Sequence, residues 1–324
     1  MRILILGAAG MVGRKLTQRL CRDGSLAGQK ITSLHLVDVI TPATLEGAPF
    51  KVERGTLDIS DATQMPALLT AEPQFIFHLA AIVSGEAEQN FEKGYAINMD
   101  GTRHLLEAIR LHANGYCPRL IFTSSIAVFG APFPEAIEDD FFLTPLTSYG
   151  TQKAICELLL SDYSRKGFVD GIGLRLPTIC VRPGKPNLAA SGFFSGIIRE
   201  PLAGQPAILP VSDKVRHWHA SPRAAVNFLI HAAGLDTKLL GARRNITLPG
   251  LSVTVAEQIE ALRQVAGEAT VRLIKHQPDA AIDKIVAGWP QNFNAHRALD
   301  LGFRAERDFA EIIKVHIEDE MSGK

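Results

Sequence analysis

Residues 2–13, RILILGAAGMVG, join a short apolar run to a glycine-rich turn that opens a helical pattern. Gly7, Gly10 and Gly13 are evenly spaced between the expected strand and a helix expected over 11–24. In this context the first glycine permits a tight turn, the second lets a pyrophosphate approach the backbone, and the third lets the helix pack closely. The stretch therefore predicts a dinucleotide site; a helix packed on a strand without any ligand is the alternative.

Apolar runs and helical patterns alternate from the N-terminus to about residue 180. This alternation is typical of βα units, which form a parallel sheet with helices on both faces. Right-handed crossovers would make it an α/β fold with a doubly wound, Rossmann-type sheet. The strands are expected at 2–7, 33–39, 50–58, 74–81, 119–125 and 171–179, with further helices over 100–115 and from Tyr149 onward.

The alternation stops after Pro177, where the chain becomes rich in proline, glycine and alanine. Loops and short helices are expected there, followed by a helix near 221–234 and an amphipathic helix at the C-terminus. The sequence thus predicts two interleaved parts. These are a Rossmann-type domain over 1–178, rejoined by about 211–248, and a second, smaller C-terminal lobe formed by 179–210 and 249–324.

The composition of the 324 residues favours a small-molecule partner, because Lys plus Arg and Asp plus Glu are balanced at 34 each. Such a balance gives no reason to expect a nucleic acid or a membrane surface as partner. The N-terminal apolar run is too short for a signal peptide or a membrane span, so we expect a cytoplasmic protein. The cysteines form no CxxC pair and are expected to be buried thiols without a metal: Cys21, Cys117, Cys156 and Cys180.

Several residues near the glycine turn fit a dinucleotide. The first helical amides, those of Met11 and Val12, would face its phosphates at the positive end of the helix dipole. Asp38 ends the second strand, where a carboxylate can accept hydrogen bonds from both ribose hydroxyls and would repel a 2′-phosphate, which favours NAD over NADP. Asp58, after the third strand, is a candidate for the adenine amino group. The alternatives are an exposed strand-end aspartate for Asp38 and a surface turn for Asp58.

The segment 147–154, TSYGTQKA, puts Tyr149 and Lys153 on one face of a helix, four positions apart. An ammonium group stabilises a phenolate, so this pair, together with the positive charge of an oxidised nicotinamide, predicts a tyrosine whose pKa falls from its ordinary value of about 10. Such a tyrosine can take a proton from a substrate hydroxyl, while the lysine also reaches the cofactor ribose. Ser125 ends a strand at the edge where ligands bind, so it could hold the substrate oxygen; strand-end capping is its alternative role.

These residues, together with HLAA at 78–81, INMDGTRHLLEA at 97–108 and TSSIAVFG at 123–130, resemble the extended short-chain dehydrogenase/reductase family. Members of that family include NAD-dependent nucleotide-sugar epimerases and dehydratases. The resemblance implies a Rossmann domain that binds NAD and a catalytic set of Ser125, Tyr149 and Lys153. It also implies a cofactor site that includes Ala80, Ala81, Asn98, Pro177 and Thr178, with Asn98 as the family's structural asparagine.

The segment 180–202, CVRPGKPNLAASGFFSGIIREPL, resembles the D-erythronate dehydrogenase branch of the family more than the nucleotide-sugar enzymes. That branch implies NAD-dependent oxidation of the C2 hydroxyl of a small free sugar acid. Arg182, Lys185 and Arg199 are cations that could pair with its carboxylate or could be solvated surface charges. The resemblance adds Arg216, so the predicted substrate-binding residues are Ser125, Tyr149, Arg182 and Arg216.

Two other functions remain open at this point. A nucleotide-sugar epimerase or dehydratase would use the same base and cofactor, and a non-enzymatic NAD-sensing protein would share the fold without needing the Ser, Tyr and Lys set. The apolar-faced helices 100–115 and 147–164 match those through which the family forms homodimers. Their own chain could equally cover them.

Overall fold

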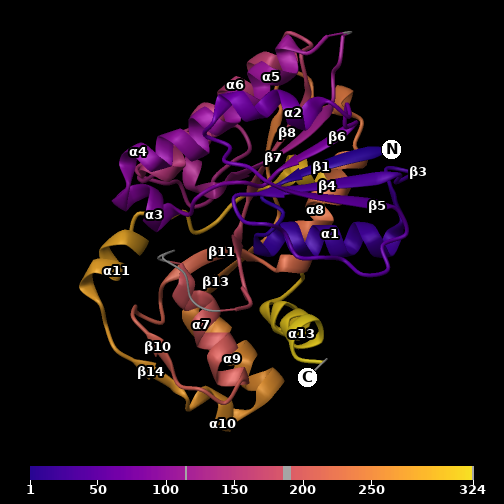
Figure 1. The fold of residues 1–324 in the computed structure, drawn as a ribbon. Helices are drawn as coiled ribbons and strands as arrows, with labels where there is room; N and C mark the ends of the chain where they lie inside the picture. The colour runs from indigo at the N-terminus through magenta and orange to yellow at the C-terminus, as the bar shows by residue number, and fades with distance from the viewer. Residues whose placement is uncertain (114, 185–190, 323–324) are drawn as a thin grey trace. The chain divides into compact units, whose positions relative to one another are not determined.

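The computed structural model describes residues 1–113, 115–184 and 191–322 (Figure 1). The chain divides into two compact units, each continuous in space but not in sequence. Unit 1 consists of Met1–Ser125, Thr147–Arg175 and Val226–Thr247. Unit 2 consists of Ile126–Leu146, Leu176–Ala225 and Leu248–Lys324.

Unit 1 is built on a seven-stranded sheet with the strand order β12-β8-β7-β6-β1-β4-β5. The pairs β1–β4, β1–β6, β4–β5, β6–β7 and β8–β12 are parallel, and the order reverses between β1 and β6. The predicted α/β, doubly wound sheet is thereby confirmed. Its strands are β1 (Arg2–Leu6), β4 (Ser33–Asp38), β5 (Lys51–Thr56), β6 (Phe75–His78), β7 (Arg119–Ser125), β8 (Asp170–Leu176) and β12 (Asn245–Thr247).

Burial follows the position of each strand in this sheet. In the central β1, Ile3, Leu4, Ile5 and Leu6 are all buried, because helices cover both faces of a parallel sheet. In the edge strand β5, KVERGT, no residue is fully buried. Charged side chains on an exposed edge also discourage pairing with another chain.

Helices cover both faces of the sheet, with α2, α5 and α6 on one side and α1 and α8 on the other (Figure 1). Their bounds are α1 (Met11–Asp23), α2 (Met65–Leu69), α5 (Gly101–Leu111), α6 (Ser148–Arg165) and α8 (Pro222–Gly234). The helix expected over 100–115 is shorter at its C-terminal end because His112 has an extended backbone. A π-helical turn, η2 (Tyr95–Asp100), leads directly into it.

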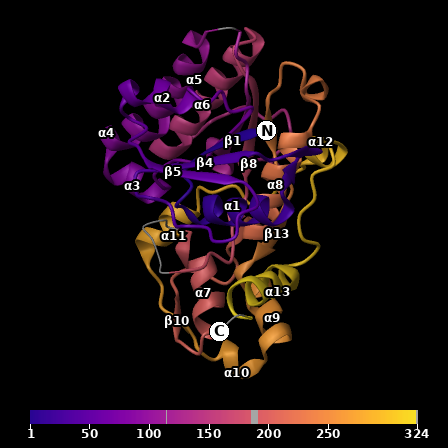
Figure 2. The ribbon, with the colours of Figure 1, turned by 45° about the vertical axis from the view of Figure 1, so that its right-hand side comes forward.

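Unit 2 contains a three-stranded sheet of the order β13-β11-β9 and a parallel pair of β10 with β14. The bounds are β9 (Thr178–Ile179), β10 (Ala207–Leu209), β11 (Arg216–Ala220), β13 (Leu251–Thr254) and β14 (Ile274–His276). Three helices pack side by side in this unit (Figure 2): α7 (Gly192–Leu202), α9 (Val255–Ala266) and α13 (Phe309–Glu320). They enclose a core with members from α7, α9 and α13, including Phe194, Leu262 and Ile312.

The remaining elements are short. In unit 1 they are β2 (Ser25–Leu26), β3 (Gln29–Lys30), η1 (Ala62–Gln64), α3 (Ser84–Gln89), α4 (Phe91–Gly94) and η4 (Thr237–Leu240). In unit 2 they are η3 (Ile126–Val128), α10 (Glu268–Val271), α11 (Ala280–Val286) and α12 (His296–Asp300). Most of them lie within connections that the sequence pattern leaves as loops.

The division into units differs from the predicted domain boundaries mainly at two segments, apart from shifts of one to three residues elsewhere. Residues 126–146 follow the Rossmann pattern in sequence but belong to unit 2, where Ile137 forms a parallel bridge with Phe293. Residues 211–225 also belong to unit 2, because β11 pairs with β9 and β13 there. Both assignments depend on pairings between distant segments, which local sequence patterns do not show.

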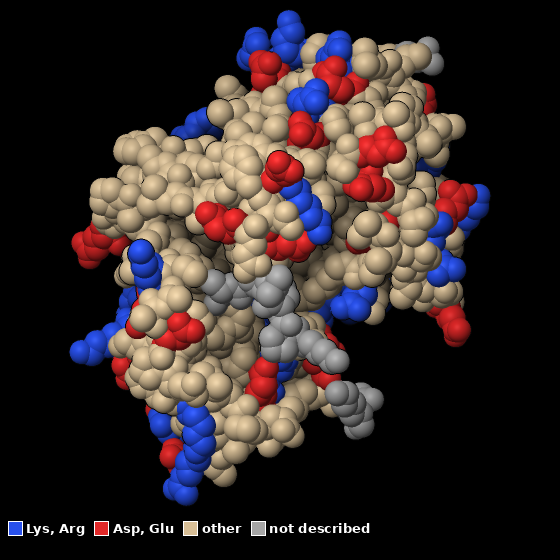
Figure 3. All heavy atoms as spheres, turned by 60° about the vertical axis from the view of Figure 1, so that its left-hand side comes forward, with Lys and Arg blue, Asp and Glu red and all other residues tan. Residues whose placement is uncertain are grey.

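Charges of both signs lie on the surface of the protein. On the face that Figure 3 draws, acidic and basic side chains are interspersed over a mostly uncharged surface. No helix among the described residues is both long and apolar enough to span a bilayer.

The four cysteines differ in their burial. Cys156 and Cys180 are buried, but Cys117 is exposed and Cys21 is only partly buried, so the expectation of four buried thiols is wrong for these two.

Candidate active site

A cavity of about 520 Å³ lies in unit 1, lined by residues that end or follow β1, β4, β5 and β6. Carboxyl ends of parallel strands beside a switch in strand order are where doubly wound folds bind ligands. The cavity brings together six of the predicted cofactor residues: Gly7, Gly10, Asp38, Asp58, Ala80 and Ala81.

Two glycines are required by the backbone that shapes this cavity. Gly7 has a φ of +85°, and a Cβ atom there would meet the backbone nitrogen of Ala80 at 2.6 Å. A Cβ atom on Gly13 would lie 2.3 Å from the carbonyl oxygen of Gly7. The turn after β1 therefore stays open to a ligand and close to the loop after β6 only because neither residue has a side chain.

The start of α1 provides donors beside the cavity. Gly10 is the N-cap and gives no side-chain cap, so the first amides of the helix, which include those of Met11 and Val12, have no partner within the helix. Met11, Val12 and Gly13 do not line the cavity themselves, whereas Gly10 does. Free amides and the positive end of the helix dipole fit a phosphate group at this turn.

Asp38 is held in a fixed orientation at the end of β4. Its Oδ2 accepts a hydrogen bond from the amide of Ala9 at 2.9 Å, and its Oδ1 accepts one from the amide of Val39 at 2.7 Å. Each oxygen retains a further lone pair, which is what two ribose hydroxyls require. Asp58 also lines the cavity, and its Oδ1 accepts hydrogen bonds from the amide and the hydroxyl of Ser60 in a turn; its role toward the adenine stays a prediction.

Asn98 shapes the cavity without lining it. The side chain is buried on η2, where Oδ1 accepts from the amide of Ile82 at 2.9 Å and Nδ2 donates to Gln152 Oε1 at 2.8 Å. Ile82 lines the cavity, and Gln152 lies on α6. Asn98 thus connects the loop after β6 to the helix that carries the tyrosine and lysine.

The predicted catalytic residues come together at the end of β7. Tyr149 and Lys153 lie on α6, whose N-cap Thr147 accepts a hydrogen bond from the amide of Gly150. The Tyr149 hydroxyl is hydrogen-bonded to the Ser125 side chain. Lys153 is 2% exposed; its Nζ donates to the Thr123 carbonyl at 2.8 Å and lies 5.7 Å from the centre of the Tyr149 ring.

Burial shifts the pKa values of both residues. It raises the pKa of Tyr149 to about 12, although the hydrogen bond from Ser125 opposes this change. It also lowers the pKa of Lys153 to about 8. For the protein groups alone, desolvation of the phenolate thus outweighs the attraction of the ammonium; the predicted fall of the tyrosine pKa also depends on the charge of an oxidised nicotinamide, and it stays a prediction.

Three residues of this region carry no motif that singled them out in the sequence. His78 lies behind Lys153, and burial together with the charge of Lys153 lowers its pKa to about 3, so it is neutral. Glu157 and Arg175 form a buried ion pair with a distance of 2.7 Å between Arg175 Nη2 and Glu157 Oε2. The signal for Glu157 was available: it is a lone carboxylate one helical turn after Lys153, in the otherwise apolar stretch ICELLL.

Unit 2 contains the remaining predicted site residues. Pro177 is buried, and the Thr178 hydroxyl lies 2.7 Å from His217 Nε2. His217 Nδ1 lies 2.9 Å from the carbonyl of Pro290, which makes Nδ1 the protonated nitrogen and Nε2 the acceptor for Thr178. Burial lowers the pKa of His217 to about 4, so this ring stays neutral and fixes the Thr178 hydroxyl.

The predicted substrate-binding arginines differ in their partners. Arg216 lines a cavity of about 700 Å³ within unit 2, but its guanidinium lies 3.3 Å from Glu257 and donates to the Ser252 carbonyl. Arg182 is partly buried and donates to the hydroxyl of Ser191 at 2.9 Å. Burial is the main reason that its pKa is lowered, and no carboxylate contributes.

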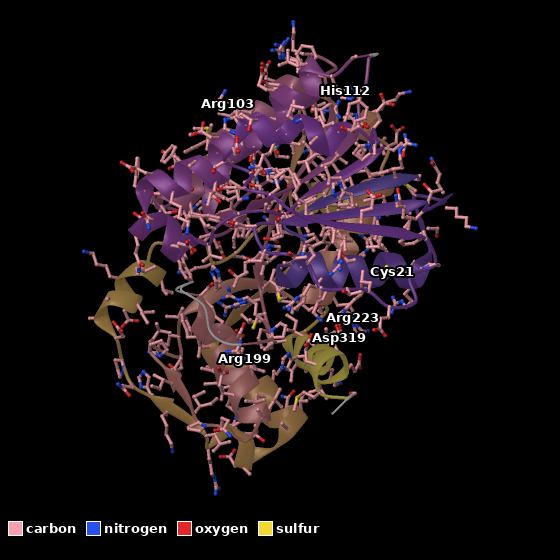
Figure 4. The ribbon with its side chains drawn as sticks, in the orientation of Figure 1. Cys21, Arg103, His112, Arg199, Arg223 and Asp319 are labelled. Carbon is pink, nitrogen blue, oxygen red and sulfur yellow. The ribbon has the colours of Figure 1, made fainter. Side chains whose placement is uncertain are left out.

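Two other arginines of unit 2 are already paired with carboxylates. Arg199 on α7 pairs with Glu200 and donates to the Arg182 carbonyl, and Arg223 pairs with Asp319 of α13 (Figure 4). Lys185, the third cation named from the sequence, lies outside the described residues. Across the described ranges, no group of three or more His, Cys, Asp or Glu side chains could hold a metal ion.

The sequence profile described as the NAD dependent epimerase/dehydratase family matches residues 3–223. The chain belongs to this family. Two relatives align with nearly the whole chain, beyond the residues that the family profile matches, and both are named D-erythronate dehydrogenase. That of Cupriavidus necator is 49% identical over 98% of each chain, and that of Haemophilus influenzae is 45% identical over 99% of this chain and all of its own.

A solved structure from the family has nearly the same fold as this chain. It is named the nucleoside-diphosphate-sugar epimerase from Agrobacterium tumefaciens, and it is 62% identical with a TM-score of 0.97, covering 100% of this chain and 95% of its own. The names of these relatives thus divide between two activities that share a fold. Fold alone does not choose between them.

Proposed function

We propose that this chain is an NAD-dependent dehydrogenase that oxidises the C2 hydroxyl of D-erythronate, or of a closely similar four-carbon sugar acid, to the 2-oxo acid. The observation that carries the proposal is full-length identity of 49% and 45% to two proteins named for this activity. The hydrogen-bonded Ser125 and Tyr149 beside the buried Lys153 supply the acid–base groups that such an oxidation needs.

In the proposed mechanism Tyr149 takes the proton from the C2 hydroxyl, and Ser125 donates a hydrogen bond to the same oxygen and orients it. Lys153 is held by the Thr123 carbonyl and stabilises the phenolate form of Tyr149. When bound, NAD supplies the hydride acceptor and a positively charged ring. We infer that this positive charge is needed to bring the tyrosine pKa down from the raised value of about 12.

We propose that Asp38 makes the cavity of unit 1 selective for NAD. The two glycine contacts, the free amides at the start of α1 and the anchored carboxylate of Asp38 all fit this dinucleotide. Asp38→Asn should weaken NAD binding by about tenfold, because a charge-assisted hydrogen bond is lost, and should leave NADP binding unchanged or improved. Isothermal titration with both dinucleotides measures this, with Asp61→Asn, a surface cap, as the control. An equal loss for NAD and NADP would contradict the assignment.

For the substrate carboxylate we propose Arg182 ahead of Arg216. A guanidinium without a carboxylate partner gains most from an anionic ligand, whereas the guanidinium of Arg216 already has Glu257 beside it. Arg182→Gln should raise the KM for the acid and leave NAD binding unchanged. Arg223→Gln, at an arginine of the same unit already paired with Asp319, is the matched control.

The second candidate function is epimerisation of a nucleotide sugar, which the name of the solved relative from Agrobacterium tumefaciens favours. An epimerase returns the hydride to its substrate, so it produces no net NADH. We would therefore follow NADH absorbance with NAD and a panel of four- to six-carbon aldonic acids. NADH formation with D-erythronate supports the dehydrogenase; no signal with any acid, while NAD still binds, would favour the epimerase and a panel of nucleotide sugars.

A homodimer and a cytoplasmic location stay predictions. Leu158 of α6 is 66% exposed, and Leu111 of α5 is also exposed, so both helices carry apolar side chains that a second copy could cover. Sedimentation of the purified protein measures the oligomeric state, and Leu158→Glu should shift a dimer of this kind toward the monomer.

A further inference from the structure

Glu157 is a buried carboxylate that the proposed mechanism does not use. It lies on α6 one turn after Lys153, so both side chains leave the same face of the helix. Its side chain is 1% exposed. A carboxylate is rarely buried to this degree unless it is paired, and even then its desolvation is unfavourable.

The contacts of Glu157 connect three elements of unit 1. Its Oε1 accepts from the Ser124 hydroxyl at 2.6 Å, and both oxygens accept from Arg175, with Nε at 3.0 Å and 3.1 Å and Nη2 at 2.7 Å. Ser124 belongs to β7 and Arg175 to β8. The carboxylate therefore fixes α6 against both strands by charge-assisted hydrogen bonds.

These contacts are part of a residue-by-residue match between α6 and the end of β7. The Thr123 carbonyl accepts from Lys153, the Ser124 hydroxyl donates to Glu157, and the Ser125 side chain is hydrogen-bonded to Tyr149. Three consecutive strand residues are thus each held by a polar side chain of one helix. A small shift of α6 along β7 would break all three contacts together.

Glu157 is also the carboxylate that acts on the Lys153 ammonium. The other groups that face Lys153 are the rings of Phe122 and Tyr149, the neutral His78 and the thiol of Cys156. At neutral pH none of these carries a negative charge, because burial also raises the pKa of Cys156 and of Tyr149. Two groups raise the lysine pKa, Cys156 and Glu157, and of these only Glu157 belongs to an ion pair.

We propose that Glu157 is a positioning residue for the proposed oxidation: it holds the Ser124–Ser125 end of β7 in register with α6 and places a carboxylate one helical turn from Lys153. It acts through Lys153 and Ser125 and has no contact with substrate in this proposal. Arg175 orients the carboxylate and offsets the cost of its burial. The proposal rests on the proposed function for its catalytic consequence, but its electrostatic part does not depend on turnover.

The test is the pKa of Lys153 in Glu157→Gln, measured by carbon-13 NMR of lysine labelled at Cε, with Lys153→Arg used to assign the signal. Glu157→Gln keeps the shape of the side chain and removes its charge. We expect the Lys153 pKa to fall by about one unit, since the loss of the carboxylate disfavours the ammonium. An unchanged lysine pKa would overturn the electrostatic role.

The matched control is Asp170→Asn, which removes a carboxylate at the amino end of β8 that pairs with Arg119 and Arg244. It should leave the Lys153 pKa at its wild-type value. The double variant Glu157→Gln with Arg175→Gln removes one negative and one positive charge, so the net charge of the buried site equals that of the wild type. The proposal expects the lysine pKa to stay low there, whereas a role in charge balance alone would return it to the wild-type value. If the single variant does not fold, the double variant decides.

Kinetics adds a second, separable readout. We divide kcat/KM of the wild type by kcat/KM of Glu157→Gln. As pH rises from the lysine pKa of the variant to that of the wild type and beyond, this ratio should rise to about tenfold. A purely structural role predicts a ratio that does not change with pH. If wild-type protein shows no turnover of any sugar acid while the NMR shift occurs, the proposed function fails and the role of Glu157 stands.

Discussion

Two ion pairs lie at opposite ends of strand β8, one with Glu157 of α6 and one with Arg119 of β7, and their settings differ. At the carboxyl ends, Arg175 and Glu157 are almost wholly buried, with side-chain exposures of 10% and 1%. At the amino ends, Arg119 and Asp170 are 18% and 30% exposed, and Arg119 also donates to carbonyls at the end of α8. The second pair fits a modest role in stability. Solvent reaches it, so burying its charges costs little, and Arg119 also caps the end of a helix.

The difference indicates where the fold accepts an energetic cost. A buried ion pair of this size could be replaced by apolar side chains without loss of stability, so its presence next to Lys153 needs a reason other than stability. The predicted catalytic residues, the glycine turn and the cavity of unit 1 all lie at the carboxyl ends. The following predictions test whether function is confined to that end of the sheet.

The largest effect is expected from Tyr149→Phe. Removal of the proposed base should lower kcat by about a thousandfold, within the range that general acid–base catalysis contributes. NAD affinity and the unfolding midpoint should change little, since the ring remains. Steady-state kinetics and dinucleotide titration measure both. Turnover close to wild type would show that the carboxyl end of β7 does not carry the chemistry.

Lys153→Met should change how stability depends on pH. The folded-state pKa of about 8 lies below the ordinary value of 10.5, so between these values the unfolded chain binds a proton that the folded chain does not. The free energy of unfolding of the wild type therefore gains about 3 kcal/mol from this group as pH rises through that window. Denaturant unfolding at several pH values should show that Lys153→Met lacks this rise; an equal rise in both proteins would mean that the ammonium is not desolvated.

Gly7→Ala and Gly24→Ala compare two glycines with positive φ at opposite ends of α1. The Gly7 substitution adds a contact of 2.6 Å with Ala80, whereas nothing lies within 4 Å of a Cβ atom on Gly24. Both should lose about 1–2 kcal/mol of stability from backbone strain. Only Gly7→Ala should also weaken NAD binding, by about tenfold or more. Equal NAD affinity in the two variants would remove the glycine turn from the dinucleotide site.

The smallest effect is expected at the amino ends of the strands. Asp170→Asn should cost about 1 kcal/mol of stability, because the lost pair is partly exposed. The pH profile of kcat/KM should not move. Thermal unfolding measures the stability, and kcat/KM over a pH series measures the profile, each with the wild type as reference. A shifted profile would mean that charges at the two ends of the sheet interact electrostatically.

The alternation of strands and helices, the doubly wound fold and the glycine turn could be predicted from the sequence, because each depends on local spacing. Gly7, Gly10 and Gly13 follow one another through a single turn, and apolar runs alternate with helical patterns along the chain. Tyr149 and Lys153 share a helix face by their spacing alone. The same reasoning predicted Ser125 from its position at a strand end.

The tertiary structure decided what these groups are next to. The Thr123 carbonyl that binds Lys153 is 30 positions away in sequence, and the Ser124 hydroxyl that binds Glu157 is 33 positions away. Burial of these contacts, rather than residue type, shifts the pKa values of Tyr149 and Lys153, and spacing along a helix does not show this burial. The sequence determined which groups are available, and only packing determined their solvation, because the cost of burying a charge depends on every element that surrounds it.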